Sequence, residues 1–348
     1  MGKKLFDFVI GNPPYQEESI GANANDTPVY HYFYDSAYAI ADKVELITPA
    51  RFLFNAGGTP KAWNEKMLSD THLKVVMYEQ KSDRVFPGTS ISGGLTVIYR
   101  DRDANYGAID VFTPFEELNT IVKKVNAVSG SSLMEMVSNR GQFRYSDLAY
   151  DEIPELINMT ADRRIAPSAF ERMPDYFTDT KPDDEYEYIK IYGNEGNKRV
   201  FKWFRRDYVA ENSIIDKYKV FISKADGAAG QIGNPIPARI SGKPVVMGPG
   251  VGSTETYISV GAEANEDEAQ AIAKYIQTRF CRLMLGLLKV TQNYAKPTWR
   301  KIPSQDFTSH SDIDWSQSVD AIDRQLYRKY NLEKKEIVFI ETYIKEMT

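Results

Sequence analysis

The sequence has almost no cysteine and very little histidine. Its 348 residues include one cysteine, Cys281, which excludes an internal disulfide and a cysteine metal cluster. The three histidines, His31, His72 and His310, show no spacing typical of metal ligation. No apolar run reaches the roughly 18 residues that a membrane span needs, and the N-terminus has no signal-peptide pattern. We therefore expect a cytoplasmic protein with no metal site and no membrane partner.

What the sequence does contain is typical of a folded protein. The chain is 42% hydrophobic and 26% charged, and its length suffices for two domains with separate cores. We divide it into residues 1–120, 121–305 and 306–348. The first segment alternates expected strands and helices, which favours an α/β fold with a largely parallel sheet. The second is expected to be a mixed α+β domain with glycine clusters at 227–233 and 248–252, and the third to be helical.

The N-terminal segment has the clearest secondary-structure pattern. We expect strands over 5–11, 44–48, 73–78 and 95–99, and helices over 29–42 and 61–70. In the first strand, Phe6, Phe8 and Ile10 alternate with further apolar residues, which predicts a strand buried on both faces. Gly11 then lets the chain turn out at the carboxyl edge of the sheet, where open α/β sheets bind ligands.

The next four residues, Asn12-Pro13-Pro14-Tyr15, carry most of the functional information. An exocyclic amine on an aromatic base is a poor nucleophile because its lone pair is delocalised into the ring. The side-chain carbonyl of Asn12 and the backbone carbonyl of Pro13, whose direction the two prolines fix, can both accept hydrogen bonds from such an amine. Tyr15 offers a flat face that replaces the lost stacking of a base flipped out of a duplex. A rigid turn without function is the alternative, since Asn and Pro are common turn residues.

The net charge of −5 hides a strong asymmetry along the chain. Residues 269–301 contain seven Lys or Arg and no acid, and residues 198–243 contain ten Lys or Arg and four acids. Aromatic residues are interleaved with this charge, as they are on surfaces that bind nucleic acid. Ordinary solvated surfaces are the alternative. The side chains that we expect to contact DNA are Lys202, Arg205, Arg206, Lys289, Lys296, Trp299 and Arg300.

Several separate blocks, in order, resemble the adenine-N6 DNA methyltransferases of type II, type IIG-like, restriction-modification systems. They begin with the NPPY loop and SISGG at 90–94. The later blocks are KVFISKADGAAG, GPGVGSTETYISVG, KYIQTRFCRLMLGLLKVTQNYAKPTWRKIPSQDF and LYRKYNLEKKEIVFIETYIKEM. Together they cover nearly the whole chain, which is far more specific than one tetrapeptide.

The resemblance implies a partial Rossmann-like methyltransferase sheet followed by a target recognition domain. It implies S-adenosylmethionine as methyl donor and double-stranded DNA as substrate. Residues 49–52 and Phe86 would then line the base pocket, although Phe86 is equally well explained as a core residue under a loop. The catalytic residues that the resemblance implies are Asn12, Pro13, Pro14 and Tyr15.

One departure from that family concerns the donor. Its donor-binding glycine motif precedes NPPY by many tens of residues, whereas only eleven residues precede Asn12 here. We therefore expect a fragment, a truncated product or a split subunit that is inactive alone. An uncovered sheet edge would favour a homodimer or a complementing methyltransferase or restriction subunit. Glycines at 248, 250 and 252 are an alternative donor turn, but such a turn must open a helix, and 253–260 is expected to be a strand.

Three functions stay open on the sequence alone. The first is site-specific adenine-N6 methylation, with direct transfer of the methyl group from sulfonium to nitrogen. The second is a non-catalytic DNA-specificity subunit that retains the loop. The third is methylation of a glutamine amide in protein or of a guanine in RNA, although such enzymes are usually compact and lack a long recognition domain. Affinity for the donor separates the first function from the second.

Overall fold

The chain forms two compact units, residues 1–123 and 124–348. The computed structural model describes residues 4–17, 27–158, 162–225, 232–233, 236–289, 292–293 and 295–347. Most of the glycine cluster at 227–233 lies outside these residues. The segment 306–348, expected to be a separate helical piece, belongs to the second unit.

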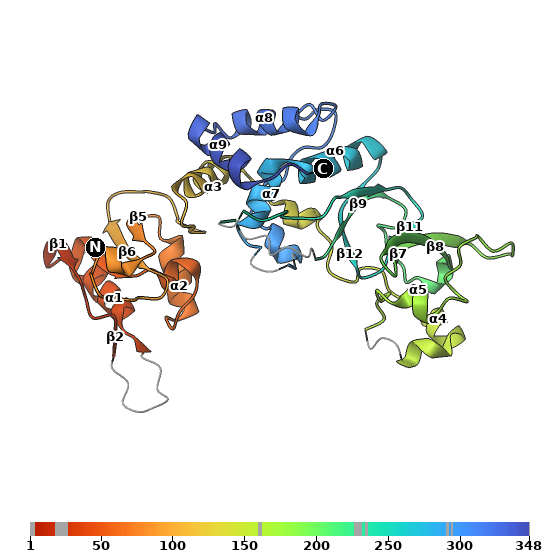
Figure 1. Cartoon of the computed structure of the whole chain (residues 1–348), viewed down its shortest axis with the longest axis horizontal. Coiled ribbons are helices and arrows are strands. Elements are labelled where there is room, and N and C mark those ends of the chain that lie inside the picture. The colour runs from red at the N-terminus through yellow and green to blue at the C-terminus, as the bar shows by residue number, and fades with distance from the viewer. Residues whose placement is uncertain are drawn as a thin grey trace. The chain divides into compact units, whose positions relative to one another are not determined.

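The first unit is built on a four-stranded sheet with the strand order β1-β4-β6-β5 (Figure 1). Its strands are β1 (Phe6–Gly11), β4 (Ala41–Pro49), β5 (Leu73–Glu79) and β6 (Leu95–Asp101). They match the four expected strands closely. β1 is parallel to β4, but β6 is antiparallel to both β4 and β5. The sheet is therefore mixed: β1, β4 and β5 run in one direction as expected, and β6 runs against them, because β5 and β6 are joined by a loop instead of the helix that a parallel crossover needs.

Two helices, α1 (Tyr30–Ile40) and α2 (Lys61–Ser69), cover one face of this sheet. Both contribute to one buried cluster, which includes Tyr34, Trp63, Met67, Val44, Leu46 and Ile98. In that core the Tyr34 hydroxyl lies 3.0 Å from Oγ1 of Thr48, which ties α1 to the end of β4. Shorter elements complete the unit: β2 (Gln16–Glu17), β3 (Thr27–Pro28), η1 (Arg51–Phe54) and η2 (Ser82–Arg84).

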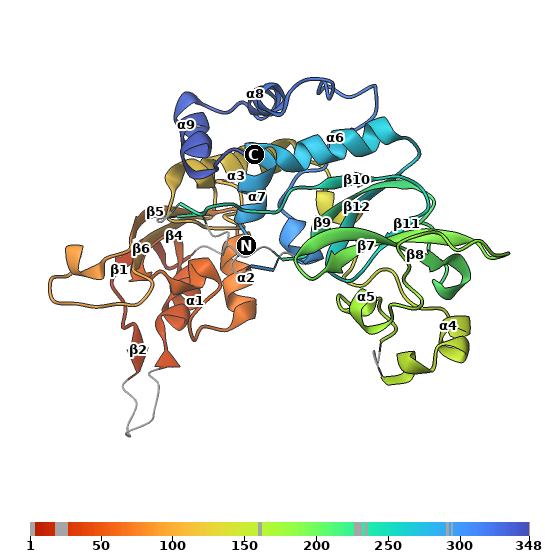
Figure 2. The same ribbon diagram turned by 45° about the vertical axis from the view of Figure 1, so that its right-hand side comes forward.

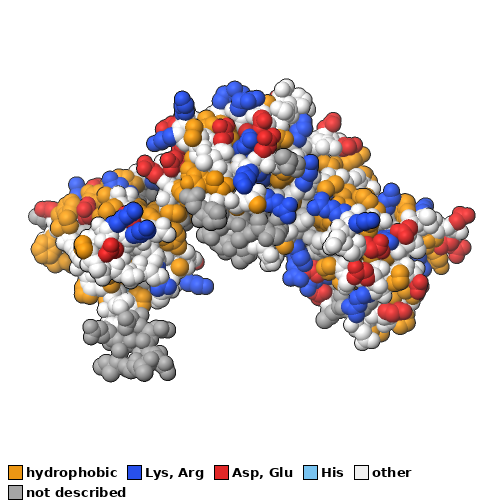
Figure 3. All heavy atoms as spheres, in the orientation of Figure 1, with side chains coloured by type: hydrophobic (Ala, Val, Ile, Leu, Met, Phe, Trp, Pro, Cys, Tyr) orange, Lys and Arg blue, Asp and Glu red, His pale blue; other side chains and the backbone are white. Residues whose placement is uncertain are grey.

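The opposite face of the sheet is open at β1. Phe8 is 47% and Ile10 is 72% exposed, and β4 is the one strand paired with β1 among the described residues. Hydrophobic side chains accordingly gather at this end of the unit in Figure 3. The expectation that this strand is buried on both faces is wrong, because an apolar run does not reveal which neighbours are present. The exposure does agree with the expectation of an uncovered sheet edge.

The described part of the second unit contains two three-stranded sheets, ordered β10-β9-β12 and β11-β7-β8. Their strands are β7 (Tyr188–Glu195), β8 (Lys198–Arg205), β9 (Tyr218–Ser223), β10 (Val245–Met247), β11 (Val251–Ser253) and β12 (Tyr257–Glu263). Aromatic side chains from both sheets meet in one core, among them Tyr192, Phe204, Phe221 and Tyr257.

Helix α6 packs along the β10-β9-β12 sheet, and α7 and α8 pack on α6 while α9 packs on α7 (Figure 2). The α-helices are α3 (Glu116–Val128), α4 (Asp147–Glu152), α5 (Ala169–Arg172), α6 (Glu266–Gln277), α7 (Arg279–Gly286), α8 (Val319–Lys329) and α9 (Lys334–Tyr343). The 3-10 turns are η3 (Leu133–Met136), η4 (Pro154–Asn158), η5 (Arg206–Tyr208) and η6 (Lys296–Trp299). Asp323 of α8 accepts hydrogen bonds from the backbone N–H groups of Arg279 and Phe280, which anchors α8 to the start of α7. No helix among the described residues combines the length and apolar character of a membrane span.

Candidate functional site

Three loops of the first unit meet at one edge of its sheet. Because β1 is parallel to β4 and β6 is antiparallel to β4, the ends of β1, β4 and β5 and the start of β6 share that edge. Residues 12–15, 50–60 and 80–94 therefore come together there. The Ala50 N–H donates to the Gly94 carbonyl oxygen at 3.0 Å, which links the second loop to the third.

The NPPY loop leaves its polar groups accessible. Asn12 and Pro14 are exposed, whereas Pro13 and Tyr15 are half-buried. The far end of the loop is tethered, because the Val29 N–H donates to the Tyr15 carbonyl oxygen at 3.1 Å and the short strands β2 and β3 pair just beyond it. The loop is thus anchored at its far end, while Asn12 stays accessible to solvent.

Tyr15 turns its hydroxyl inward. The hydroxyl is buried and has no well-aligned hydrogen-bond partner among the described residues. Burial raises the pKa of Tyr15, an effect that the nearby Asn12 side chain opposes and does not cancel. The Tyr15 phenol also contributes to the raised pKa of Tyr34, which places it near the Tyr34 hydroxyl at the end of β4. Tyr15 therefore stays protonated at neutral pH.

The loop over 80–94 is ordered around one serine. Ser82 Oγ donates to the Thr89 carbonyl oxygen (3.0 Å) and accepts from the Ile91 N–H (2.8 Å). The Phe86 N–H donates to the Ser82 carbonyl oxygen at 2.9 Å. Phe86 itself is half-buried at this end of the loop.

Arg51, the first residue of η1, packs against Gly57 of its own loop and Gly93 of the loop over 80–94. A Cβ atom at Gly93 would lie 2.6 Å from Arg51 Cγ, and one at Gly57 would lie 3.1 Å from Arg51 Cβ. Both glycines have positive φ, 85° and 94° respectively. A side chain at either position would collide with Arg51, so these glycines hold the Arg51 side chain at this edge of the sheet.

In the second unit the seven side chains expected to contact DNA do not form one surface. Trp299 and Lys289 are 0% exposed, and Lys202 is 6% exposed. Lys202 pairs with Asp179 at 2.7 Å and with Glu195 at 2.9 Å. Trp299, Lys289 and Lys202 therefore lie in the interior, where they offer no surface to DNA.

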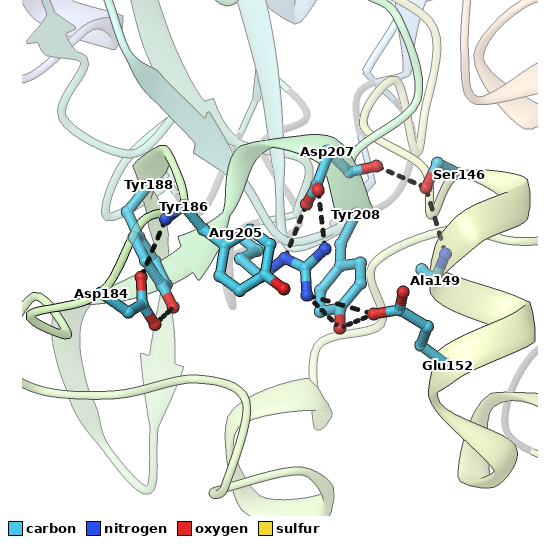
Figure 4. A network of polar contacts seen from close by, with 9 residues as sticks. All are labelled: Ser146, Ala149, Glu152, Asp184, Tyr186, Tyr188, Arg205, Asp207 and Tyr208. Atoms are coloured by element: carbon cyan, nitrogen blue, oxygen red, sulfur yellow. Dashed lines mark hydrogen bonds and ion pairs between the residues drawn. The ribbon is translucent and has the colours of Figure 1, made fainter.

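Arg205 is held within the protein on every side (Figure 4). Its guanidinium lies between the rings of Tyr186 and Tyr208, with Cζ 3.7 and 4.0 Å from the two ring centroids. Nε and Nη2 donate to the Asp207 carboxylate (2.9 and 2.7 Å), and Nη1 donates to Glu152 (3.1 Å). The side chain is 13% exposed, so it joins β8, η5 and α4.

The three remaining expected contacts keep some access to solvent. The side chain of Arg206 is 26% exposed, with Nη2 3.9 Å from Asp216. Lys296 is half-buried and lines a cleft of about 680 Å³. Arg300 is exposed and lines a separate hollow with Lys301.

The cleft beside Lys296 brings in basic residues that the charge runs did not indicate. Arg140 and Arg144 line it with Lys296, and the nearby acids are Glu135 and Glu263. Behind it, Glu255 forms ion pairs with three cations, Arg140, Arg164 and Lys224. One sequence signal was available: Glu255 is the one acid in the otherwise uncharged block GPGVGSTETYISVG.

No group of three or more metal-ligating side chains gathers in the part of the chain that the structure describes. Cys281 is buried in α7, and burial raises the pKa of its thiol, so it cannot serve as a nucleophile.

Comparisons with known proteins found similarity to restriction-modification enzymes. One solved structure similar to this chain is the type IIG restriction endonuclease BpuSI, at 10% identity and a TM-score of 0.32, over 92% of this chain and 48% of that one. Another is the type IIL restriction-modification enzyme MmeI in complex with DNA, at 10% identity and a TM-score of 0.33, over 97% and 56%. The chain thus spans about half the length of these two proteins, and no curated protein matches the sequence. Over residues 1–86, the segment that contains the NPPY loop, the chain matches the Eco57I restriction-modification methylase family.

Proposed function

We propose that this chain carries the base-binding loop and the DNA-holding unit of an adenine-N6 DNA methyltransferase of a restriction-modification system. The position of Asn12–Tyr15 at the carboxyl edge of β1, inside the segment that matches the methylase family, supports this most strongly. The parallel pairing of β1 with β4 brings the loop after β4 to the same edge. The loop over 80–94 closes a third side.

In this role the Asn12 side-chain oxygen and the Pro13 carbonyl oxygen accept hydrogen bonds from the 6-amino group of a flipped adenine. Such bonds favour a tetrahedral nitrogen, whose lone pair is directed out of the ring plane and toward an electrophile. The Tyr15 ring stacks on the base, while its hydroxyl is buried on the protein side. Neither step requires an acid or a base on Tyr15, in keeping with its raised pKa.

S-adenosylmethionine is the donor that the family similarity implies, and the described residues do not fit it. Gly248 and Gly250 lie between β10 and β11 and Gly252 lies within β11, so this turn leads into a strand and not into a helix. We therefore derive no step through the donor. We propose that its site is completed against the exposed edge of β1 by a second copy or by a complementing methyltransferase or restriction subunit.

The test uses base flipping, because it does not depend on methyl transfer. A pool of random duplexes is first enriched for those that the chain binds, and each adenine of the site is then placed opposite an abasic position. Weakening the pair lowers the cost of flipping, so the unaltered chain should bind the modified duplex more tightly. Tyr15→Ala should lose about fivefold or more of that preference, because stacking is worth roughly 1–3 kcal/mol per base.

Tyr32→Ala is the matched control, because Tyr32 is a 61% exposed aromatic residue of the same unit on α1. An equal preference in the Tyr15 variant and the control would contradict the base-binding role of the loop. Calorimetry with S-adenosylmethionine, with and without DNA, separates a catalytic function from that of a non-catalytic specificity subunit. Stronger binding to single-stranded RNA than to duplex DNA would favour an RNA substrate instead.

A further inference from the structure

Glu255 is a buried carboxylate that is shared by three cations. It lies between β11 and β12 and is 7% exposed. Nζ of Lys224 is 2.9 Å and Nη1 of Arg164 is 3.2 Å from Glu255 Oε1, and Nε of Arg140 also donates to that oxygen. The Glu255 N–H donates to the Ile165 carbonyl oxygen at 2.8 Å, which pins the backbone next to Arg164.

The charge around Glu255 is not balanced. Asp162 pairs with Arg164, and Arg144, bridged to Arg164 through the backbone, lies close enough to help lower the pKa of Asp162. Burial and the two guanidiniums of Arg140 and Arg164 lower the pKa of Lys224 to about 8, although Glu255 is in contact with it. Four cations therefore share two carboxylates, and the excess is positive.

The two arginines bound to Glu255 use their donors differently. Nη1 of Arg164 donates to Glu255, and its Nη2 pairs with Asp162. The Arg164 side chain is 25% exposed. Gly141 holds it there, since a Cβ atom on Gly141 would lie 1.9 Å from Arg164 Cδ. Arg140 is anchored through Nε alone, and its side chain is 57% exposed at the cleft. Its two Nη groups make no hydrogen bond within the described part of the chain.

We propose that Glu255 presents the free guanidinium edge of Arg140 to a pair of hydrogen-bond acceptors on duplex DNA. This rests on the proposed function, and it assigns a DNA-contacting residue outside the basic runs of the sequence. The acceptors are either two phosphate oxygens or the O6 and N7 atoms of a guanine in the major groove. Both match the planar fork of a guanidinium, which a lysine cannot reproduce.

The surroundings fit a DNA strand better than a small anion. Arg144 and Lys296 line the same cleft as Arg140, so its three cations outnumber its two acids, Glu135 and Glu263. A carboxylate that fixes Arg140 through Nε reduces the side-chain entropy lost on binding and leaves the fork pointing outward. Arg205 has no such free edge, because all of its nitrogens are bound within the protein.

The first experiment measures the Kd of the full chain for a fluorescently labelled duplex from the enriched pool, by fluorescence anisotropy. Arg140→Ala and Arg140→Lys should each weaken binding by about tenfold, because a bidentate pair contributes on that order. Arg324→Ala, which removes an exposed arginine of α8 in the same unit, should change the Kd by less than about twofold. Full retention of affinity by Arg140→Lys would show that charge alone is needed, and it would overturn the presentation of a fork.

The second experiment asks whether a substitution at Glu255 strengthens or weakens DNA binding. Glu255→Gln removes a negative charge beside three cations, so a purely electrostatic surface would bind DNA more tightly. If Glu255 positions Arg140, this variant should instead bind more weakly, by about three- to tenfold. Tighter binding by a variant with an unchanged circular dichroism spectrum would overturn the proposal. If the variant misfolds, the Arg140→Lys result decides.

The dependence of binding on sequence and on salt distinguishes a phosphate contact from a guanine contact. If Arg140 binds phosphate, Arg140→Ala should lower the slope of log Kd against log salt by about one and should weaken all duplexes equally. If Arg140 binds guanine, the same variant should leave that slope nearly unchanged and relax the preference at one base pair. Failure of the unaltered chain to bind any duplex would overturn the proposed function itself. Binding that both Arg140 variants leave unchanged would overturn only the present inference.

Discussion

Arg140 and Arg205 lie in the same unit, and both are held by carboxylates, but they differ in what they leave free. Arg205 binds Asp207 and Glu152, lies between two tyrosine rings and is 13% exposed. Arg140 is held through one nitrogen and is 57% exposed. The sequence alone favours Arg205 over Arg140 as a DNA contact, since Arg205 lies in a basic, aromatic run and Arg140 does not. The number of unused donors, and not the local charge, separates a structural arginine from one that is free to bind.

The largest expected effect follows from removing the saturated arginine. Arg205→Ala removes two ring contacts and leaves Asp207 and Glu152, whose side chains are 45% and 43% exposed, without their partner, so the free energy of unfolding should fall by about 2 kcal/mol. Arg140→Ala should change it by less than about 0.5 kcal/mol, because its side chain is mostly exposed. Urea denaturation followed by tryptophan fluorescence measures both.

The contrast between the two arginines is contradicted if both variants lose similar stability, since Arg140 would then stabilise the fold as much as Arg205 does. It also breaks if Arg205→Ala, at a temperature where it is folded, weakens DNA binding as much as Arg140→Ala. In that case the contacts drawn in Figure 4 would break when DNA binds, and Arg205 would exchange Asp207 for a phosphate group.

The sequence predicts the fold of the first unit well because its signals are local. All four strands of its sheet and the helices α1 and α2 follow from short apolar patterns and lie close to the expected bounds. The direction of β6 and the exposure of β1 could not be predicted, since both depend on which segments pair. Apolar side chains such as Ile10 look the same in sequence whether a neighbour covers them or not.

The same distinction applies to the candidate sites. The NPPY loop is a contiguous motif, so sequence alone identifies it, and the structure adds the inward hydroxyl of Tyr15. The cluster at Glu255 joins Arg140 to a residue 115 positions away. Trp299 likewise reads as an aromatic in a basic run, yet it is 0% exposed. Burial and pairing between distant segments decide these roles, and a single sequence carries little information on either.

A smaller effect is expected from a glycine that supports the Glu255 cluster. Gly141 has φ of 64°, and an alanine there would also collide with Arg164. Gly196 has φ of 56°, and a Cβ atom there would meet nothing within 4 Å, so Gly196→Ala reports the backbone strain alone. Gly141→Ala should be less stable than Gly196→Ala by about 1–2 kcal/mol, the usual cost of overpacking.

That difference is again measured by urea denaturation, and DNA affinity adds a second readout. Displacement of Arg164 disturbs the carboxylate that holds Arg140, so Gly141→Ala should weaken DNA binding while Gly196→Ala should not. Equal stability and equal affinity in the two variants would mean that Arg164 moves aside freely. Glu255 would then not be a fixed anchor for Arg140.

The smallest expected effect is on the pH dependence of DNA affinity, and it compares two lysines. Burial lowers the pKa of Lys219 and of Lys224 to about 8, with two guanidiniums contributing at Lys224. Lys219 is 0% exposed and donates to three backbone carbonyl oxygens, those of Ile215, Lys217 and Gly248. Lys224 lies in the cluster at the cleft. An anion brought to Arg140 should therefore raise the pKa of Lys224 and leave that of Lys219 unchanged.

A pKa that rises on binding means that the complex takes up a proton. Affinity should then be highest below pH 8 and should fall as the pH rises above about 8, by a few-fold in total because the lysine and the DNA contact are not adjacent. Anisotropy titrations between about pH 7 and about pH 9.5 measure this, and Lys224→Met should give a flatter profile over that range. Lys219→Met should keep the slope of the unaltered chain. If Lys224→Met keeps that slope as well, the proton is taken up elsewhere, and DNA does not approach the cations held by Glu255.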